Sequence, residues 1–252
     1  MDSTLINIIN SFKPISLEEM DSVKLLVRND YKFITTIPTL YAILKDVKDD
    51  YTILTINQNP FQEYKTIYFD TAEDSMYMSH QNGKLNRYKI RHRTYLSTNA
   101  EFLEIKFKTN KGKTFKKRIP FPISKDLAEA NDFITKNSPY SGEQLRHKSL
   151  VEYTRLTLVN LAQGERATID IDLQVTNCET NETVDFSHVC IIELKRDKST
   201  SNSKLQSVLL KHRVFQRGMS KYSIGTAAIY DIKKNRFKKK LRFIEKLKIN
   251  SK

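Results

Sequence analysis

The sequence predicts an α+β fold, mainly antiparallel β, in which eight strands form a closed β-tunnel with helices packed outside. Basic and apolar residues alternate through several strand-length segments, most clearly over residues 87–93, where every second side chain is basic. Turn signals such as Gln81-Asn82-Gly83 and Asn110-Lys111-Gly112 lie between neighbouring segments and suit antiparallel hairpins. Helical segments precede, interrupt and follow the strands.

The N-terminal elements follow from local patterns. Residues 5–12 predict a short helix, and residues 17–27 predict a helix or turn that leads into the first strand. Residues 27–35 alternate charged with uncharged side chains and predict that strand. Pro38 suits the first turn of a helix, which we expect to continue to about Lys45.

The rest of the chain predicts seven further strands and several helices. The strands are expected at residues 65–70, 85–95, 101–109, 114–121, 151–160, 165–175 and 184–196. The helices are expected at residues 124–137, 141–148, 203–212 and 236–248. We expect one tunnel domain over residues 27–230, with a helical lead-in at 1–26 and a basic amphipathic tail at 231–252.

The composition predicts a soluble, cytoplasmic protein. Apolar residues make up 39% of the chain, and no run approaches the roughly 20 apolar residues that span a bilayer. The first residues lack the basic region of a signal peptide. Cys178 and Cys190 are therefore expected to be reduced thiols, and their spacing matches no zinc motif.

Much of the net charge of +14 lies near the C-terminus. Residues 231–252 carry ten Lys and Arg against two acidic residues, a net charge of +8. The helical part is amphipathic, with Leu241, Phe243 and Ile244 among its apolar positions. This tail either packs on the domain or binds an acidic membrane surface or a nucleic acid. Because most of the excess charge is in the tail, we do not expect nucleic acid to be the partner of the domain.

The predicted strands carry rows of Arg and Lys on their polar faces. Arg87, Lys89, Arg91 and Arg93 line one side of a single strand. The pattern recurs at residues 102–108, 116–118, 153–155, 166–172 and 192–195. Like charges on neighbouring strands destabilise a sheet unless an anion lies among them. An ordinary solvated face is the alternative, but such faces mix both signs, so repetition over several strands favours a bound polyanion.

A minority of acidic residues shares these faces. They are Asp30, Glu104, Asp170, Asp172 and Glu193, too few to neutralise the basic rows but suited to a divalent cation through their hard oxygens. A flat sheet would leave the charged face open, whereas a closed sheet makes it a lumen that focuses positive potential. The pattern indicates a site for a metal-bound phosphate chain, such as linear polyphosphate or a nucleoside triphosphate.

Other site chemistry has little support in the sequence. The five histidines are scattered without ligand spacing, and six glycines include no Gly-rich phosphate loop. Tyr64, Tyr68, Phe69 and Tyr95 are expected to be core or rim aromatics rather than platforms that stack on bases.

Several short motifs occur in an order that resembles a known family. Residues 28–32 (Arg-Asn-Asp-Tyr-Lys) resemble its first tunnel strand, and residues 67–71 (Ile-Tyr-Phe-Asp-Thr) resemble its Tyr-Phe-Asp-Thr segment. Further matching motifs lie at residues 87–95, 102–106, 166–170, 192–195 and 220–222. The ordered set, from about Arg28 to Tyr222, resembles the VTC domain of the polyphosphate polymerases, within the triphosphate tunnel metalloenzymes.

The resemblance implies transfer of the γ-phosphate of ATP to a growing polyphosphate chain inside a basic tunnel. The implied metal is manganese, with magnesium as the alternative, and the implied partners are ATP and inorganic polyphosphate. Residues expected to act in catalysis are Lys32, Arg91, Arg93 and Lys221. Residues expected to bind phosphate are Arg28, Arg87, Lys89, Lys106, Lys108, Lys116, Arg118, Tyr153, Arg155, Arg166, Lys195 and Ser220. Expected metal ligands are Glu193 as the principal one, Asp170 and Asp30.

Two features of the strands affect these expectations. A slip of one residue in the strand at 114–121 would turn Lys116 and Arg118 outward. Many members of the superfamily carry Glu-x-Glu-x-Lys on the first strand, whereas residues 28–32 here hold one shorter carboxylate, Asp30. Activation of a water molecule for hydrolysis requires a well-placed metal and base. The missing carboxylate on the first strand therefore favours transfer to phosphate over hydrolysis.

Three alternatives remain at the level of sequence. The same fold could hydrolyse triphosphate or short polyphosphate. A non-enzymatic module could bind polyphosphate or inositol polyphosphate, displayed near a membrane by the basic tail. A nucleic-acid binder would depend on the tail, residues 231–252, rather than on the strands.

Overall fold

The computed structural model describes residues 2–21, 28–197 and 202–249. The strands are β1 (Lys13–Ile15), β2 (Arg28–Thr36), β3 (Thr52–Leu54), β4 (Gln62–Asp70), β5 (Arg87–Tyr95), β6 (Ala100–Lys108), β7 (Thr114–Pro120), β8 (Arg146–Asn160), β9 (Glu165–Asn177), β10 (Thr183–Asp185) and β11 (Val189–Asp197). The helices are α1 (Ser3–Asn10), α2 (Leu17–Asp21), α3 (Ile37–Val47), α4 (Ser75–Gln81), α5 (Asn131–Asn137), α6 (Lys204–Lys211), α7 (Lys221–Ile229) and α8 (Lys238–Ile249), with 3₁₀ turns η1 (Leu127–Ala130) and η2 (Gly142–Gln144).

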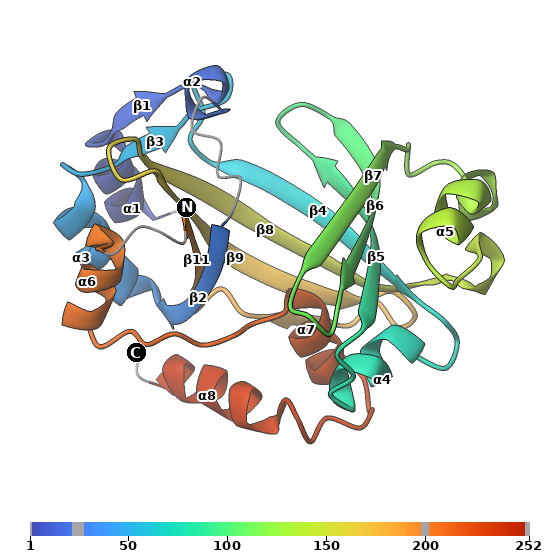
Figure 1. Ribbon diagram of the computed structural model, residues 1–252. Helices are drawn as coiled ribbons and strands as arrows, with labels where there is room; N and C mark the ends of the chain where they lie inside the picture. The colour runs from blue at the N-terminus through green and yellow to red at the C-terminus, as the bar shows by residue number, and fades with distance from the viewer. Residues whose placement is uncertain (1, 22–27, 198–201, 250–252) are drawn as a thin grey trace.

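One mainly antiparallel sheet dominates the molecule, as predicted. Its strand order is β2-β11-β9-β8-β4-β5-β6-β7, and each neighbouring pair on this path is antiparallel (Figure 1). These eight strands overlap the eight segments predicted from the sequence. The short strands β1, β3 and β10 lie off the path, and β1 pairs with β3 in parallel.

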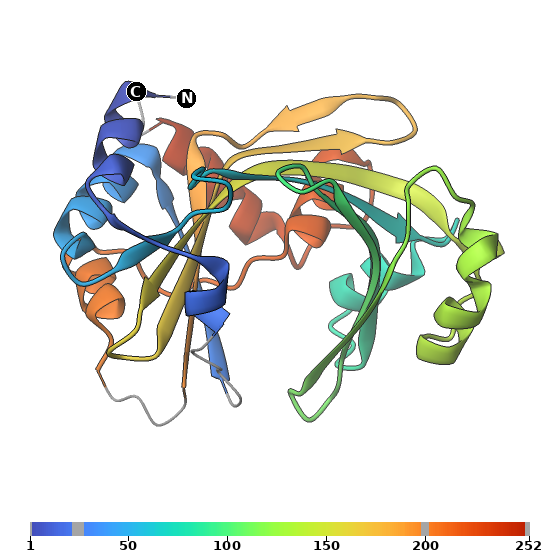
Figure 2. The ribbon, with the colours of Figure 1, turned by 90° about the horizontal axis from the view of Figure 1, so that it is seen from above.

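The sheet bends into an arch rather than a closed tube (Figure 2). Its two end strands are β2 and β7, and no backbone pairing joins them within the described residues. The predicted closure is therefore not confirmed. Strand β7 is exposed along nearly its whole length, and its neighbouring lysines, Lys116 and Lys117, are of the kind that protects a free edge from pairing with another chain.

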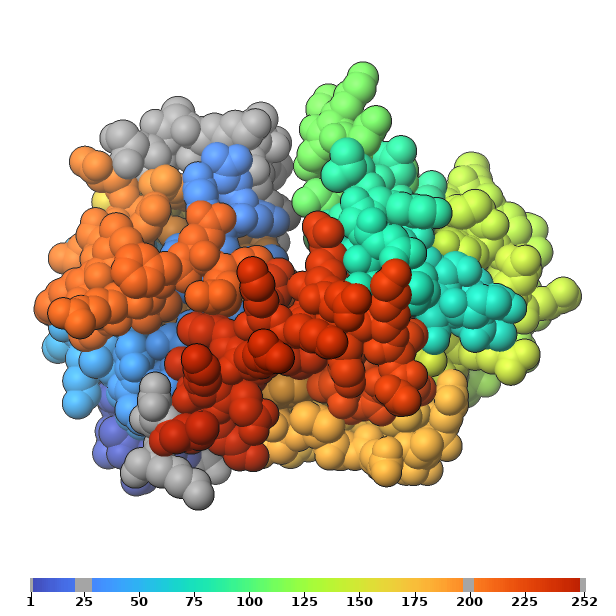
Figure 3. Space-filling model, turned by 90° about the horizontal axis from the view of Figure 1, so that it is seen from below, coloured from blue at the N-terminus to red at the C-terminus, as the bar shows by residue number. Residues whose placement is uncertain are grey.

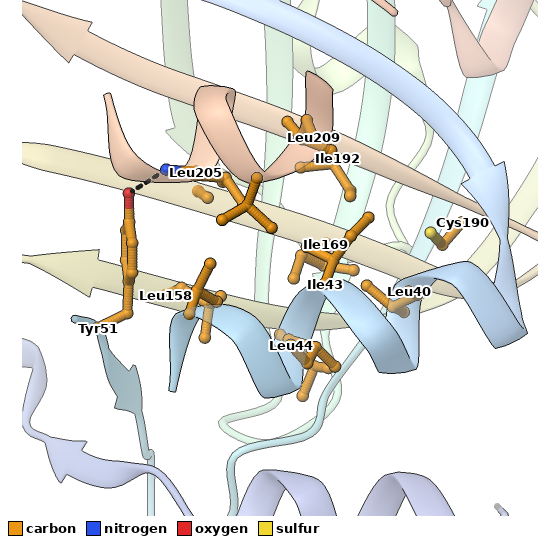
Figure 4. Packing of buried hydrophobic residues seen from close by; sticks show 14 of the residues in the cluster. Leu40, Ile43, Leu44, Tyr51, Leu158, Ile169, Cys190, Ile192, Leu205 and Leu209 are labelled. Carbon is orange, nitrogen blue, oxygen red and sulfur yellow. Dashed lines mark hydrogen bonds between the residues drawn. The ribbon is translucent and has the colours of Figure 1, made fainter. Parts of the chain in front are cut away.

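Helices α1, α3 and α6 cover the convex side of one half of the sheet. The hydroxyl of Thr36 accepts a hydrogen bond from the backbone N–H of Thr39, and Pro38 occupies the first turn of α3, as predicted. Leu40 and Ile43 of α3 are fully buried against β8, β9, β11 and α6 (Figure 4). Because strand side chains alternate, burying this face leaves the other set pointing into the arch.

The other half of the sheet has its own convex layer. Ile90 of β5 and Leu103 of β6 pack against Ile134 of α5, and none of the three is exposed to solvent. Arg91 and Glu104, one position further along their strands, face the concave side. The two convex cores thus hold the charged face of both halves in place.

Helix α7 lies against the concave side of the arch, where it packs on β8 and β9. Six consecutive residues, Tyr222 to Ala227, are buried, so the helix has no solvent face and shows no amphipathic period in the sequence. Gly225 permits the close approach: a Cβ there would lie 2.8 Å from Cγ1 of Val175 in β9. Without such a period, the sequence pattern does not predict a helix at α7.

Helix α8 confirms the prediction of a helix at residues 236–248. Its apolar residues Leu241, Phe243, Ile244 and Leu247 join the core beneath α7, with Ile244 buried. The helix therefore packs on the domain through its apolar face. Its basic residues lie on the remaining surface, where Lys238, Lys239, Arg242, Lys246 and Lys248 are exposed.

Other elements differ from the prediction in definable ways. The helix expected at residues 141–148 is limited to the 3₁₀ turn η2, because β8 begins at Arg146 and continues the strand pairing with β4. Helix α4 was not predicted; Asp70 accepts hydrogen bonds from the backbone N–H groups of Met76 and Tyr77 and fixes its first turn. Of the segment expected at 17–27, residues 17–21 form α2 and residues 22–27 lie outside the described chain.

Two simpler expectations concern cysteines and membrane spans. Cys178 and Cys190 are both free thiols, and Cys190 is buried. None of the helices in the described ranges combines the length and the apolar character needed to cross a bilayer.

Candidate functional site

Cross-strand pairing brings basic side chains from both halves of the sheet to the concave face. In β5 and β6, Arg91 lies opposite Glu104 and Lys89 lies opposite Lys106. The corresponding pairs in the other half are Lys32 with Glu193 and Arg155 with Asp170. Figure 3 shows a hollow between the β2 residues in blue and the β6–β7 hairpin in green. The rows predicted from the sequence therefore converge on one concave surface.

Glu193 of β11 lies between two lysines. Its Oε2 accepts a hydrogen bond from Nζ of Lys32, and its Oε1 lies 2.8 Å from Nζ of Lys195. Burial alone would raise the pKa of Glu193, but the charges of Lys195 and Lys32 hold it far below its usual value. Glu193 is therefore ionised and neutralises part of the charge of both lysines.

Asp170 of β9 forms a second group with Arg155 and Lys221. Nε and Nη2 of Arg155 donate to its two oxygens at 2.6 and 2.9 Å, a bidentate pair, and Nζ of Lys221 donates to Oδ2. Burial would raise the pKa of Asp170, but Arg155 and Lys221 lower it strongly. Lys221 also lies over the ring of Tyr153, 4.5 Å from its centre. The first residue of α7 is thereby tied to the sheet.

Glu104 of β6 forms a third group with Arg91 and Lys116. Nε and Nη2 of Arg91 both approach Oε2, at 2.7 and 2.6 Å, and Lys116 forms an ion pair with Oε1. The Glu104 side chain is 1% exposed. Burial opposes its ionisation, but Arg91 and Arg93 lower its pKa to about 2. The contact also shows that Lys116 points into the arch, so the one-residue slip considered for β7 does not occur.

Three further cations on this face have no carboxylate within ion-pair distance in the part of the chain that the structure describes. Arg93 is 7% exposed and donates to the hydroxyls of Tyr153, at 3.0 Å, and Thr66, at 3.3 Å. Burial lowers the pKa of Lys89, and Lys106 and Arg87 lower it further. Burial and Lys32 lower the pKa of Lys106. The face thus holds more positive charge than its carboxylates neutralise.

The N-terminus of α7 contributes a hydrogen-bonded chain to the same face. Nζ of Lys89 donates to Oγ of Ser220 at 2.6 Å, and Ser220 donates to Ser223 at 3.2 Å. Ser223 lies 2.6 Å from Nδ1 of His80 in α4. Burial and the nearby cations lower the pKa of His80 to about 3, so a neutral imidazole ring forms this hydrogen bond. This series of hydrogen bonds holds the hydroxyl of Ser220 beside Lys89.

The remaining predicted phosphate ligands lie towards the margins of the face. Arg118 lies over the ring of Phe102, with the guanidinium carbon 4.5 Å from its centre. Arg87 and Lys108 are a cross-strand pair at the start of β5. Arg166 lies opposite Lys195 and contacts Sδ of Met20 at 3.6 Å. The side chain of Arg28 lies outside the described part of the structure.

The predicted metal ligands are spread over the face. In the ranges 2–21, 28–197 and 202–249, no three His, Cys, Asp or Glu side chains are grouped as a metal site. Asp30 is exposed and lies opposite Lys195 rather than opposite another carboxylate. Glu193 still fits as a single protein ligand, because magnesium-type sites take one or two carboxylates and complete their shell with substrate phosphates and water.

Asp172 differs from the sequence expectation, whereas two aromatic residues agree with it. Asp172, expected on the charged face, is exposed and has a φ of 52° at an irregularity in the pairing of β8 and β9, which breaks the alternation that places Asp170 inside. Tyr64 and Tyr68 are core aromatics, as expected: Tyr68 is buried, and Tyr64 packs against the same core cluster. Tyr64 also lies beside the basic face, with Arg93 and Arg155 at 5.2 and 5.1 Å from its ring centre. Because Tyr64 and Tyr68 are four residues apart in β4, strand alternation places both rings on the same side of the sheet, and this spacing was visible in the sequence.

Comparison with known proteins places the chain among related sequences and folds. The model of the VTC domain matches residues 27–230. Among curated protein sequences, none matches this chain. A proposed adenylate cyclase from Bacillus halodurans superposes with a TM-score of 0.50 at 13% identity, over 77% of this chain and 94% of that one. A proposed adenylyl cyclase from Hippeastrum, described as having dominant triphosphatase activity, gives 0.51 at 14% identity, over 79% and 95%. At these identities the structural likenesses show the fold alone.

Proposed function

The chain belongs to the VTC domain family, and from this premise we propose that it transfers the γ-phosphate of ATP to a growing polyphosphate chain. The observation that carries the proposal is the surplus of buried or half-buried cations on the concave face. Glu193, Asp170 and Glu104 each hold two cations, yet Arg93, Lys89 and Lys106 have no carboxylate partner among the described residues. A phosphate chain supplies the missing negative charge.

The arginines would hold the phosphates in fixed positions. Arg91 and Arg155 present planar forks whose orientation is set by Glu104 and Asp170, and such forks grip phosphate oxygens in two places. Arg93 is held by two hydroxyl groups and keeps its charge free for the substrate. In phosphoryl transfer, catalysis is mostly positioning and electrostatic stabilisation, which fixed arginines supply.

Lys32 and Lys221 would follow the charge that develops at the transferred group. Both are tied to a carboxylate in the structure, through Glu193 and Asp170. Lysine is a point charge on a flexible stem, so each ammonium can turn from its carboxylate towards a phosphate oxygen. The acceptor phosphate is already ionised at neutral pH and requires no strong general base.

The metal enters as a proposal as well. Glu193 would hold manganese, or magnesium in its place, and Asp170 and Asp30 would be auxiliary ligands. The ion would neutralise charge between neighbouring phosphate oxygens. Glu104, Asp170 and Glu193 are each paired with Lys or Arg in the part of the chain that the structure describes, so none of these three is a free base for activating water, which favours transfer over hydrolysis.

The test is an assay of ATP turnover with manganese in which ADP, orthophosphate and polymer are separated. We expect ADP and long polymer, loss of both on chelation, and recovery when manganese is restored. Arg93→Gln, Lys221→Gln and Glu193→Gln should each lower turnover about 100-fold or more, as removal of a transition-state contact does. Lys65→Gln is the control, because Lys65 pairs with Glu152 at 3.2 Å and not with any carboxylate of the concave face.

Each other outcome identifies an alternative. Orthophosphate without polymer would assign the site to hydrolysis of triphosphate or short polyphosphate. Tight binding of polyanions with no metal-dependent release of ADP would assign it to a binding module. Equal turnover in the Arg93 and Lys65 variants would refute the concave face as the site.

A further inference from the structure

A second group of cations continues the basic concave face onto the C-terminal segment. Arg87 lies at the end of the concave row, next in that row to Lys89, and its Nη1 donates to the carbonyl of Lys84 at 3.0 Å. The side chain of Arg236 lies beside Gly83, in the turn before β5. A Cβ atom added to Gly83 would be only 2.8 Å from Nη1 of Arg236. Figure 3 shows the red C-terminal residues against the teal residues of this region.

The group extends from Arg236 along the N-terminal part of α8. Lys240 lies near both Arg236 and Arg217. Burial lowers the pKa of Lys240, and the charges of these two arginines lower it further. A Cβ at Gly218 would lie 3.8 Å from Nζ of Lys240, which places that ammonium beside the backbone next to Arg217. Arg87 is affected in the same way, since burial and then Arg236 lower its pKa.

Two members of this group, Arg217 and Arg236, are held against the domain by contacts that the structure shows. The guanidinium carbon of Arg217 lies 3.8 Å from the ring centre of Phe243, and Phe243 packs with the core that anchors α8. The side-chain oxygen of Gln81, in the orientation that satisfies its neighbours, accepts from the backbone N–H of Arg236 at 3.3 Å. Arg236 and Arg217 are therefore attached to the domain through both the α4 turn and α8.

No carboxylate offsets this group in the described chain. None of Arg87, Arg217, Arg236 and Lys240 forms an ion pair with an acidic side chain within residues 2–21, 28–197 and 202–249. The apolar face of α8 is already occupied by the domain, so these charges are not the polar side of a free amphipathic helix. Clustered like charges at a packed surface destabilise it unless an anion is bound.

We propose that Arg87, Arg236, Lys240 and Arg217 form an outer track that binds linear polyphosphate beyond the reacting phosphates. The track begins where the concave row ends, so one extended polyanion would contact both. This inference rests on the proposed function for the identity of the ligand. It adds a binding site that depends on chain length: a short phosphate fills the concave face, and a long chain reaches α8 as well.

The experiment compares affinities for inorganic tripolyphosphate and for long linear polyphosphate by calorimetry on the full chain. The variant is Arg236→Glu with Lys240→Glu, and the control is Lys246→Glu with Lys248→Glu, which makes the same charge change on exposed residues in the C-terminal part of α8. We expect the ratio of long-chain to tripolyphosphate affinity to fall about tenfold in the variant and less than about twofold in the control. The pair Arg236→Gln and Lys240→Gln should give a smaller loss in the same direction, and it serves if charge reversal disturbs folding.

Equal ratios in the variant and the control would overturn the track. So would a loss confined to binding of anionic lipid vesicles or single-stranded RNA, with polyphosphate unaffected. The outcome is separable from the proposed function. If the protein makes no polymer from ATP but the variant shows the length-dependent loss of affinity, the outer track is supported and the polymerase proposal is refuted. If polymer forms but the affinity ratios are unchanged, the polymerase proposal is supported and the outer track is refuted.

Discussion

Replacement of Glu104 by Gln tests how far the concave face depends on its few carboxylates. Glu104 is 1% exposed and holds Arg91 and Lys116. Its pKa is lowered from 4.5 to about 2 in the folded protein, a difference that corresponds to ~3 kcal/mol of stability. Because the folded pKa lies below the unfolded one, this contribution is present above about pH 4.5 and is lost as the pH falls towards about 2.

At neutral pH we expect Glu104→Gln to lower the free energy of unfolding by ~3 kcal/mol, which for a domain of this size lowers Tm by about 6–12 °C. Near pH 3 the difference from the natural protein should narrow, because Glu104 is then mostly protonated in the unfolded chain but still mostly ionised in the folded one, so part of its ionic contribution is lost. Added tripolyphosphate should raise the Tm of the variant more than that of the natural protein, because the anion replaces the lost charge beside Arg91.

Differential scanning calorimetry across this pH range measures all three effects. The control is Glu152→Gln, since Glu152 pairs with Lys65 at 3.2 Å in a half-exposed contact and should contribute less than about 1 kcal/mol. Equal Tm values for the Glu104 and Glu152 variants, together with equal responses to tripolyphosphate, would refute the view that Glu104 offsets a buried excess of positive charge.

Three further predictions concern the same face and its supports. Arg93→Gln should leave Tm unchanged or slightly raised while it lowers turnover, because it removes a buried cation that has no carboxylate partner among the described residues; calorimetry and the ATP assay on one preparation separate the two effects. Asp70→Ala should lower the free energy of unfolding by about 2–3 kcal/mol in urea titrations, since it leaves backbone N–H groups of α4 and the hydroxyl of Tyr222 without their acceptor. Gly225→Val should destabilise by about 1–3 kcal/mol by overpacking α7 against Val175, and a variant as stable as the natural protein would contradict the close approach of α7.

Much of the site was predictable because strand alternation is a local property. The spacing of Arg91 and Arg93 fixed their common side, and the structure has both on the concave face. The same rule failed at Asp172, where an irregularity in the pairing of β8 and β9 reverses the side. It also gave no account of α7, whose uniformly buried residues have no period for a pattern to detect.

The partners of these side chains depended on distant parts of the chain. Glu104 appears in the sequence as one more acid among basic residues, and only the folded arch shows it buried beside Arg91. Lys32 meets Glu193 across 161 positions, and Lys221 meets Asp170 across 51. Such distances are set by the path of the whole chain, which local propensities do not encode.

The sequence by itself determined which residues are charged, which segments form strands and which side chains share a face, since these follow from composition and from the two-residue repeat of a strand. The tertiary structure decided that the sheet is an open arch within the described residues, that Glu104, Asp170 and Glu193 each hold two cations, and that Arg93, Lys89 and Lys106 are left without a carboxylate there. The physical reason is that burial and charge pairing arise only when segments far apart in the chain are brought into contact, because desolvation and Coulomb energy depend on distances in space.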